Sequence, residues 1–442
     1  MTLPIEPKDE KLPAFDRESV NKFLDQVSTT HQILLDGLDY DKVNTLQLDK
    51  VNLHIFLKEE IKIVVKRLFP QDGDEFLKKL ELAVFDEVVG FGPAEYLLRD
   101  SSVTDIFING PSEVYVERKG KVERELIFFT DSDHIFRLVQ RTAAKSGRHL
   151  DLSSPYFDAQ LSDRSRIHAI IPPLAIDGIK VSIRKYSFQK LDIYNMVSKG
   201  SLDEIMAKYL QLAVQARLNI AICGGTGSGK TTLLNSLLTA ISPGERMVTI
   251  EDTPELEPAH PHAVRLLTRV PNAEGKGAVT QADLMINALR MRPDRVILGE
   301  LRDSEAFNLL HAMNTGQDGT MVTLHASGAE EVVSRLINMI LMARYALTTE
   351  SMRQQIAGAL DLIIYVARLV NGSRKVMTIS QVSTGQDGDI LIEDVFRYDI
   401  ETITPTELVG QFVNLNPTPT KRIVSKLVTA GLAKDFNAIF KT

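Results

Sequence analysis

The sequence predicts an α/β protein in which a doubly wound parallel sheet follows a smaller α+β domain and an N-terminal helical segment. From Leu202 onward, apolar strand patterns alternate with amphipathic helix patterns, which is typical of a parallel sheet covered on both faces. Within that part, the run from Leu218 to Leu238 reads LNIAICGGTGSGKTTLLNSLL. It places the pattern G-x-x-x-x-G-K-[ST] between a β-branched strand and a leucine-rich helix, which is the context a phosphate-binding P-loop requires.

The composition of the chain is that of an ordinary globular protein with two or three domains. It has 442 residues, of which 44% are hydrophobic and 25% charged, and a formal net charge of −7 without a dense run of Lys or Arg. No nucleic-acid surface is therefore expected. The single cysteine, Cys223, excludes an internal disulfide and a cysteine-cluster zinc site, and is expected to be a buried structural thiol. Because no run approaches the roughly 18 apolar residues of a spanning helix, we expect a cytoplasmic protein that reaches a membrane only through a partner.

The first 89 residues are expected to form a tail and a small helical bundle. Residues 1–16 are rich in proline and charge and are predicted to be disordered. Helical periodicity then begins near Val20 and continues in a longer stretch from Leu48 to Leu68, where we expect a break near Lys58. A third helix is expected over Asp74–Val89.

Residues 90–188 are expected to form a compact α+β domain. One helix is predicted to begin after a cap at Asp131 or Ser132 and to end before Gly147. The predicted strands are Val103–Asn109, Val114–Arg118, Val122–Phe129, Arg166–Ile171 and Lys180–Tyr186. Weak periodicity and Gly200 then place an interdomain linker at 189–202.

Residues 203–442 are expected to form the P-loop domain. Helices are predicted at about 203–217, 230–241, 280–291, 303–314 and 328–343, and one or two closing helices within 417–440. The strands predicted between them are Asn219–Cys223, Met247–Glu251, Ala263–Thr268, Arg295–Leu298 and Met321–Leu324, followed by Leu362–Ala367, Lys375–Ser380 and Ile390–Tyr398.

The P-loop residues predict binding of a nucleoside triphosphate such as ATP with Mg²⁺. Glycines let successive backbone N–H groups face inward as an anion nest, and the helix that begins at the loop adds the positive end of its dipole. Lys230 supplies a point charge for the β- and γ-phosphates, and the Thr231 hydroxyl is suited to bind Mg²⁺. The expected nucleotide-binding residues are Gly224, Gly225, Thr226, Gly227, Ser228, Gly229, Lys230, Thr231 and Thr232.

Hydrolysis also requires a group that positions water, and the ends of three strands offer candidates. Val296–Leu298 resembles a Walker B strand in which Gly299 replaces the usual Asp, and Glu300 follows it as the residue that orients or deprotonates water. We expect this strand to lie beside the P-loop strand. Glu251 is the first candidate for an additional Mg²⁺ ligand and Asp252 the second, although Asp252 can equally serve only to begin a turn. His325, at the end of another strand, is expected to contact the γ-phosphate.

Several sequence motifs resemble the type II/type IV secretion and pilus-assembly ATPase superfamily. They are the P-loop GGTGSGKTT, the run IEDTPEL, the tract EGKGAVTQADLMINALRMRPDRVILGELRD and the box GTMVTLHAS, and the long tract is most similar to the tight-adherence pilus, CpaF-type, branch. The resemblance covers residues 81–400 and is most specific over 218–330. The absence of a tetracysteine motif separates the chain from type II secretion relatives.

The resemblance implies a RecA-like ATPase domain, a preceding α+β domain and a ring-shaped homohexamer that works on an inner-membrane platform protein. It assigns Glu251 to the acidic box, Glu300 to Walker B and His325 to the His box. Arg265 and Arg269 match an arginine pair after the acidic box, while Arg164 and Arg184 lie where the smaller domain could supply charge to the nucleotide. Spacing alone does not decide which of these arginines reaches ATP.

These observations together predict an ATP-hydrolysing motor that powers assembly, or also retraction, of a pilus or secretion apparatus. Two alternatives stay open. One is a P-loop ATPase that translocates DNA, which the acidic net charge disfavours and which salt-sensitive DNA binding would support. The other is a regulatory ATP-binding module without hydrolysis, which would not need Glu251, Glu300 and His325.

Overall fold

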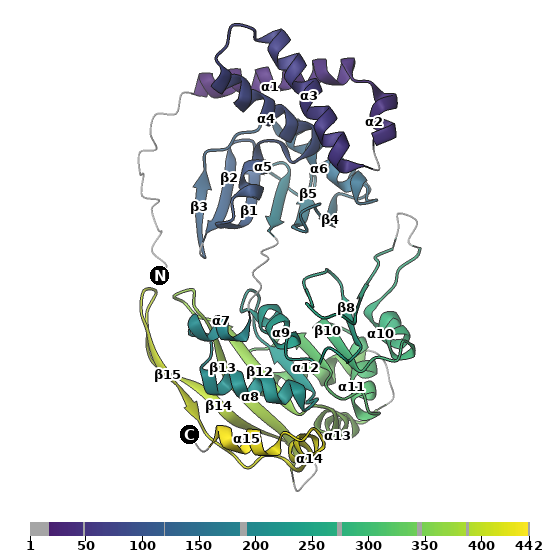
Figure 1. Ribbon diagram of the computed structural model, residues 1–442, viewed down its shortest axis with the longest axis vertical. Helices are drawn as coiled ribbons and strands as arrows, with labels where there is room; N and C mark the ends of the chain where they lie inside the picture. The colour runs from purple at the N-terminus through teal and green to yellow at the C-terminus, as the bar shows by residue number, and fades with distance from the viewer. Residues whose placement is uncertain are drawn as a thin grey trace. The chain divides into compact units, whose positions relative to one another are not determined.

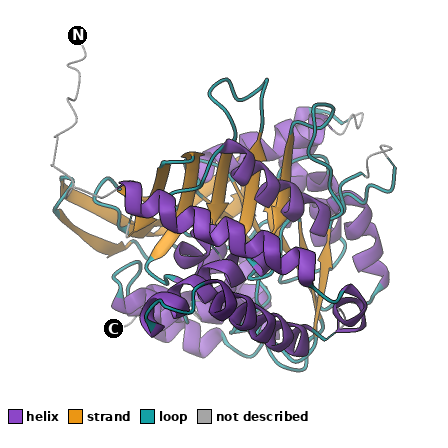
Figure 2. Cartoon of the chain, turned by 90° about the horizontal axis from the view of Figure 1, so that it is seen from above, coloured by secondary structure: helices purple, strands orange, loops and turns teal. Residues whose placement is uncertain are grey.

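The computed structural model describes residues 17–46, 49–118, 120–185, 192–271, 276–342, 347–385 and 389–440. The predicted tail, residues 1–16, lies outside these ranges. The chain divides into two compact units, Met1–Phe188, drawn in purple to blue in Figure 1, and Gln189–Thr442, drawn in teal to yellow. Figure 2 shows the helices and strands of the chain by colour.

Four helices form the first part of the N-terminal unit. They are α1 (Arg17–Gly37), α2 (Tyr40–Leu46), α3 (Lys50–Leu68) and α4 (Asp74–Val89). The predicted break near Lys58 is wrong, because α3 is continuous and buries Leu57, Ile61 and Val65 along one face. Asp49 caps this helix by accepting a hydrogen bond from the Asn52 backbone N–H.

An antiparallel six-stranded sheet forms the second part of this unit, in the order β3-β2-β1-β6-β5-β4. Asp131 caps α6 by accepting from His134 N, as the sequence predicted. The strand β4 was not predicted, and β3 ends at Glu125 rather than at Phe129. The elements are η1 (Gly92–Ala94), α5 (Glu95–Arg99), β1 (Val103–Gly110), β2 (Glu113–Arg118), β3 (Lys121–Glu125), α6 (Ser132–Lys145), β4 (Tyr156–Gln160), β5 (Arg166–Ile170) and β6 (Lys180–Arg184).

The C-terminal unit contains a nine-stranded sheet in the order β15-β14-β13-β12-β7-β11-β10-β8-β9. Pairing is parallel from β12 to β9 and antiparallel from β12 to β15. The strands are β7 (Ile220–Cys223), β8 (Met247–Glu251), β9 (Ala263–Leu267), β10 (Arg295–Leu301), β11 (Met321–Leu324), β12 (Leu362–Arg368), β13 (Arg374–Thr384), β14 (Ile390–Ile403) and β15 (Leu408–Asn414). The expectation that the Walker B-like strand lies beside β7 is wrong, because β11 is inserted between β7 and β10.

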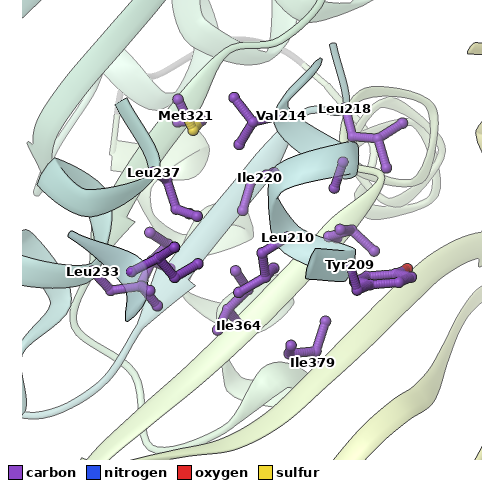
Figure 3. Close-up of a cluster of buried hydrophobic side chains, with 14 of the residues drawn as sticks. Tyr209, Leu210, Val214, Leu218, Ile220, Leu233, Leu237, Met321, Ile364 and Ile379 are labelled. Atoms are coloured by element: carbon purple, nitrogen blue, oxygen red, sulfur yellow. The ribbon is translucent and has the colours of Figure 1, made fainter. Parts of the chain in front are cut away.

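Helices cover both faces of this sheet, which confirms the predicted fold class. Ile220 and Ile222 of β7 pack into one hydrophobic cluster with α7, α8, α9, α14 and α15, part of which Figure 3 shows. Ala221 and Cys223 point to the other cluster, with α10 to α13. The helices are α7 (Ile193–Ser198), α8 (Glu204–Gln215), α9 (Lys230–Leu238), α10 (Gln281–Arg290), α11 (Glu305–Asn314), α12 (Ala329–Met342), α13 (Thr349–Ala359), α14 (Lys421–Thr429) and α15 (Ala433–Ile439).

Three smaller features complete the comparison with the predicted elements. The range expected as a linker, 189–202, contains α7, whose Ile193 and Met196 are buried in the core of the C-terminal unit. Burial raises the pKa of the Cys223 thiol to about 12, in agreement with the predicted structural role. None of the helices in the described ranges combines the length and apolarity that crossing a membrane requires.

Candidate active site

The P-loop connects β7 to α9 and depends on three glycines. Gly227 and Gly229 have φ angles of 69° and 100°, which a residue with a side chain rarely adopts. At Gly224, a Cβ atom would lie only 2.2 Å from the carbonyl oxygen of Val366 on β12. The neighbouring strand therefore packs directly against the first turn of the loop and supports its shape.

Lys230, the first residue of α9, is buried beneath the loop. Its ammonium group donates hydrogen bonds to the carbonyl oxygens of Gly224 and Gly225, at 3.0 and 2.9 Å. These contacts hold the positive charge inside the curve of the loop, where the phosphates of a nucleotide would bind.

The Thr231 hydroxyl donates a hydrogen bond of 3.3 Å to the carboxylate of Glu255. Glu255 was not among the predicted metal ligands, yet the structure brings it to the hydroxyl suited to Mg²⁺. The signal that could have identified it is its position in the run IEDTPEL, four residues after Glu251. Asn235 of α9 donates to the Glu255 carbonyl oxygen and so ties this segment to the P-loop helix.

Glu251, at the end of β8, is buried and organises the turn that follows it. Its Oε1 atom accepts hydrogen bonds from the backbone N–H groups of Glu255 and Leu256, at 2.8 and 2.7 Å. Burial raises the pKa of Glu251 to about 7, although these bonds act in the opposite direction. A Cβ atom at residue 299 would approach Glu251 Cγ to 3.0 Å, so Gly299 leaves room for this side chain where a Walker B Asp would crowd it.

Glu300 on β10 lies between two cationic or ionisable side chains. His325, which directly follows β11, brings Nε2 within 2.7 Å of Glu300 Oε1, without the geometry of a hydrogen bond. Arg302 donates a short hydrogen bond to Glu300 Oε2, and its guanidinium is 3.8 Å from Asp252 Oδ2. The sequence singled out Glu300 and His325 but missed Arg302, whose hydrogen bond orients the Glu300 carboxylate.

The four predicted arginines differ in their surroundings. Arg265 on β9 reaches to 3.8 Å from the Glu251 carboxylate, whereas Arg269 donates to the carbonyl oxygen of Gly277. Arg164 and Arg184 are exposed side chains of the N-terminal unit, in the turn after β4 and at the end of β6. Their contribution to a nucleotide stays a prediction.

A further arginine that the sequence did not single out contacts the P-loop directly. Arg374, at the start of β13, donates a hydrogen bond of 2.9 Å from Nε to the carbonyl oxygen of Gly227. Arg368, at the end of β12, lies 3.7 Å from the position of a Cβ atom on Gly227. The hairpin between β12 and β13 thus brings two guanidinium groups alongside the loop.

The site as a whole combines an anion-binding loop with carboxylates at the carboxyl ends of parallel strands, where open α/β sheets gather their ligands. The P-loop fits a phosphate chain, and the oxygen atoms of Thr231 and Glu255 are of the type that Mg²⁺ prefers. No group of three or more His, Cys, Asp or Glu side chains suited to a metal occurs in the described ranges, so a metal here would rely on phosphate and water oxygens as well. Glu300 Oε1 is buried and accepts no hydrogen bond from the described residues, and a carboxylate oxygen is of the type that can accept a proton from water.

The chain is similar to several known proteins. The model of the family described as type II/IV secretion system protein matches residues 87–395. A protein of Mycobacterium tuberculosis (strain H37Rv) named for conjugal transfer is 39% identical over 300 residues, which cover 66% of this chain and 85% of that protein. The type IV secretion system protein VirB11 of Brucella suis is 32% identical over 301 residues, covering 62% and 83%. The crystal structure of the Brucella suis VirB11 ATPase has 29% sequence identity, coverages of 65% and 94%, and a TM-score of 0.35.

Proposed function

Because the chain belongs to the type II/IV secretion system protein family, we propose that it is a Mg²⁺-dependent ATPase motor of the tight-adherence pilus branch. Its turnover would drive pilus assembly, or also retraction, through an inner-membrane platform protein. The observation that carries this proposal is the presence of a complete P-loop together with Glu300 on β10 and His325 directly after the neighbouring parallel strand β11. A module that only binds ATP would need neither side chain.

Each residue of the site has a defined role in this proposal. The loop amides and Lys230 bind the phosphates, and Thr231 binds the metal with help from Glu255 or from the predicted Glu251 and Asp252. Glu300 activates the attacking water, and His325 contacts the γ-phosphate. When bound, Mg²⁺ would neutralise charge on the phosphates during transfer.

We also propose that the working unit is a homohexamer in which a second domain or subunit completes each site. One or more arginines would stabilise the charge on the transferred phosphate, and the candidates are Arg164, Arg184, Arg265 and Arg269. An arginine of this kind can increase the rate by about 10³–10⁵-fold. Resemblance of the motifs to ring-forming ATPases supports this part of the proposal.

ATP turnover per protomer, measured over a wide range of protein concentration, tests the proposal. We expect activity per protomer to rise with concentration and then to saturate, in step with the mass of the assembly measured by light scattering. Constant activity from a monomer would contradict the shared-site hexamer, and absence of turnover at every concentration and in the presence of the membrane partner would contradict the ATPase. Turnover that depends on added DNA would favour a DNA-translocating motor instead.

The variant Glu255→Gln is expected to raise the Mg²⁺ concentration for half-maximal turnover by about tenfold, because it removes a charged oxygen beside Thr231. The measurement is a Mg²⁺ titration of ATP turnover. Glu330→Gln is the matched control, since Glu330 is an exposed acid in the first turn of α12 and carries no proposed role at the site. If Glu255→Gln left the Mg²⁺ requirement unchanged, Glu255 would not be a metal ligand, and Glu251 would be the next candidate.

A further inference from the structure

A cavity of about 360 Å³ lies within the N-terminal unit and shares no residue with the nucleotide site. Its walls come from α1 and α4 of the helical bundle, from η1 and α5, and from the first half of α6 together with Thr130, two residues before that helix. This volume falls in the range of sites that bind small molecules. Much of the cavity is formed by residues that precede the part of the chain matched by the family model, so the family does not assign it a role.

Apolar side chains form most of the cavity surface. Phe23, Leu24 and Val27 contribute from α1, and Leu82 and Ala83 from α4, while Pro93 and Tyr96 close the opposite side. Leu82 and Tyr96 are 52% and 67% exposed, which leaves apolar surface in contact with solvent. A ligand with an apolar body would remove this surface from water, which is favourable.

One wall of the cavity is a buried Glu87–His134 pair. The Thr130 backbone N–H donates to His134 Nδ1 at 3.3 Å, so the ring proton sits on Nε2 and is donated to Glu87 Oε2 at 2.9 Å. A Cβ atom at residue 92 would lie 2.8 Å from this carboxylate oxygen, so Gly92 keeps the approach to the pair open.

Most charged side chains that line the cavity are paired with another described side chain, and Arg137 is the exception. Asp86 accepts two hydrogen bonds from Arg99, Lys79 pairs with Glu75 at 2.7 Å, and Glu87 is bound by His134. Among the described residues, none forms a hydrogen bond or ion pair with the exposed guanidinium of Arg137.

His31 adds a polar group at the same place. Burial lowers the pKa of this residue, so its ring is neutral near pH 7 and can both donate and accept a hydrogen bond. No described residue hydrogen-bonds to the ring. The apolar cavity therefore presents a free guanidinium and a neutral imidazole to an incoming ligand.

We propose that this cavity is a binding site for a small, free amphipathic carboxylic acid, with its carboxylate at Arg137 and its acyl or aromatic body against Phe23, Leu24 and Tyr96. A neutral analogue would lose the charged hydrogen bond, and a cationic analogue would be repelled by Arg137. The site thus distinguishes ligands by the charge of their head group and tolerates variation in the apolar body.

Isothermal titration of the full chain with decanoate, decanol and decylamine tests this site. We expect saturable binding of about one decanoate per chain, weaker binding of decanol and none of decylamine. Arg137→Gln should weaken decanoate binding by about tenfold or more and leave decanol unchanged, as expected for loss of one charge-assisted hydrogen bond. The matched control is Arg124→Gln, which changes another exposed arginine of the same unit whose guanidinium donates to the Ser112 carbonyl oxygen.

A second variant tests the volume instead of the charge. Ala83→Trp should fill the cavity and abolish binding of both decanoate and decanol, with an unchanged circular dichroism spectrum as the check on folding. Equal decanoate affinity in Arg137→Gln and Arg124→Gln, or binding of decylamine as tight as that of decanoate, would overturn the proposal. So would binding to phosphatidylglycerol vesicles without binding to decanoate, since the ligand would then be a membrane surface.

Discussion

Replacing Glu300 with glutamine is expected to lower ATP turnover by about 10²–10⁴-fold while ATP still binds, because the amide has no basic oxygen to accept a proton from water. The substitution keeps the size of the side chain and a carbonyl oxygen for Arg302, so the end of β10 should hold its conformation. Binding is expected to depend on the P-loop amides and Lys230, which this substitution leaves in place. Turnover is measured by phosphate release, and binding by titration with a fluorescent ATP analogue.

Glu330→Gln is the matched control for this experiment. Glu330 is an exposed acid in the first turn of α12, in the same unit, and it carries no proposed role. Turnover in this variant should equal that of the unmodified chain. If Glu300→Gln retained normal turnover, the general base would have to be another group, and Glu251, whose pKa of about 7 suits proton transfer, would be the first to examine.

The parts of the site predicted from the sequence are those defined by local motifs. The P-loop, Glu300 and His325 each follow an apolar strand, and in a parallel sheet the ends of such strands meet at one edge. Glu255 and Arg302 were missed because what identifies them is a contact with another segment: Glu255 meets Thr231 of α9, and Arg302 meets Asp252 after β8. The order of β11 and β10 in the sheet was missed for the same reason, because the residues of a parallel strand do not indicate which strand pairs with it.

Elements of the fold with strong local periodicity were likewise predicted, whereas elements that depend on contacts with distant segments were not. Strong periodicity correctly predicted α4, α6 and α12, whereas the short strands β4 and β15 and the helix α13 were missed. β15 contains Gly410, where a Cβ atom would lie 2.5 Å from the Asp399 carbonyl oxygen of β14, so the glycine that weakens the strand pattern is required by the pairing. The break predicted near Lys58 does not occur, because Lys58 is exposed on a helix whose buried face continues from Leu57 to Ile61.

The largest effect on stability is expected at Asp361, a fully buried carboxylate immediately before β12. It accepts hydrogen bonds from the Asn219 backbone N–H at 2.7 Å, from Arg422 Nε at 2.5 Å and from Lys426 Nζ at 2.7 Å. Asp361→Ala would leave the two cations of α14 without their shared counter-charge. We therefore expect the free energy of unfolding to fall by about 3 kcal/mol or more, as measured by a urea titration followed by circular dichroism.

Asp318→Ala provides a control that shares a partner with Asp361. Asp318 pairs with Lys426 at 2.6 Å, but its side chain is 43% exposed, so its loss should cost less than about 1 kcal/mol. Similar losses in the two variants would show that the buried position of Asp361 does not matter.

The position of Asp361 also connects stability to nucleotide binding. Asn219 directly precedes β7, the strand that enters the P-loop, and its side chain also donates to the Ala359 carbonyl oxygen and accepts from Thr320 N beside β11. The buried carboxylate of Asp361 thus connects α14 to the start of β7, which leads into the P-loop. Asn219 connects the same point to the start of β11, which is followed by His325. Because these hydrogen bonds fix the spacing of β7 and β11, we expect Asp361→Ala to weaken ATP binding under conditions where the variant remains folded. Asp318→Ala should leave ATP binding unchanged.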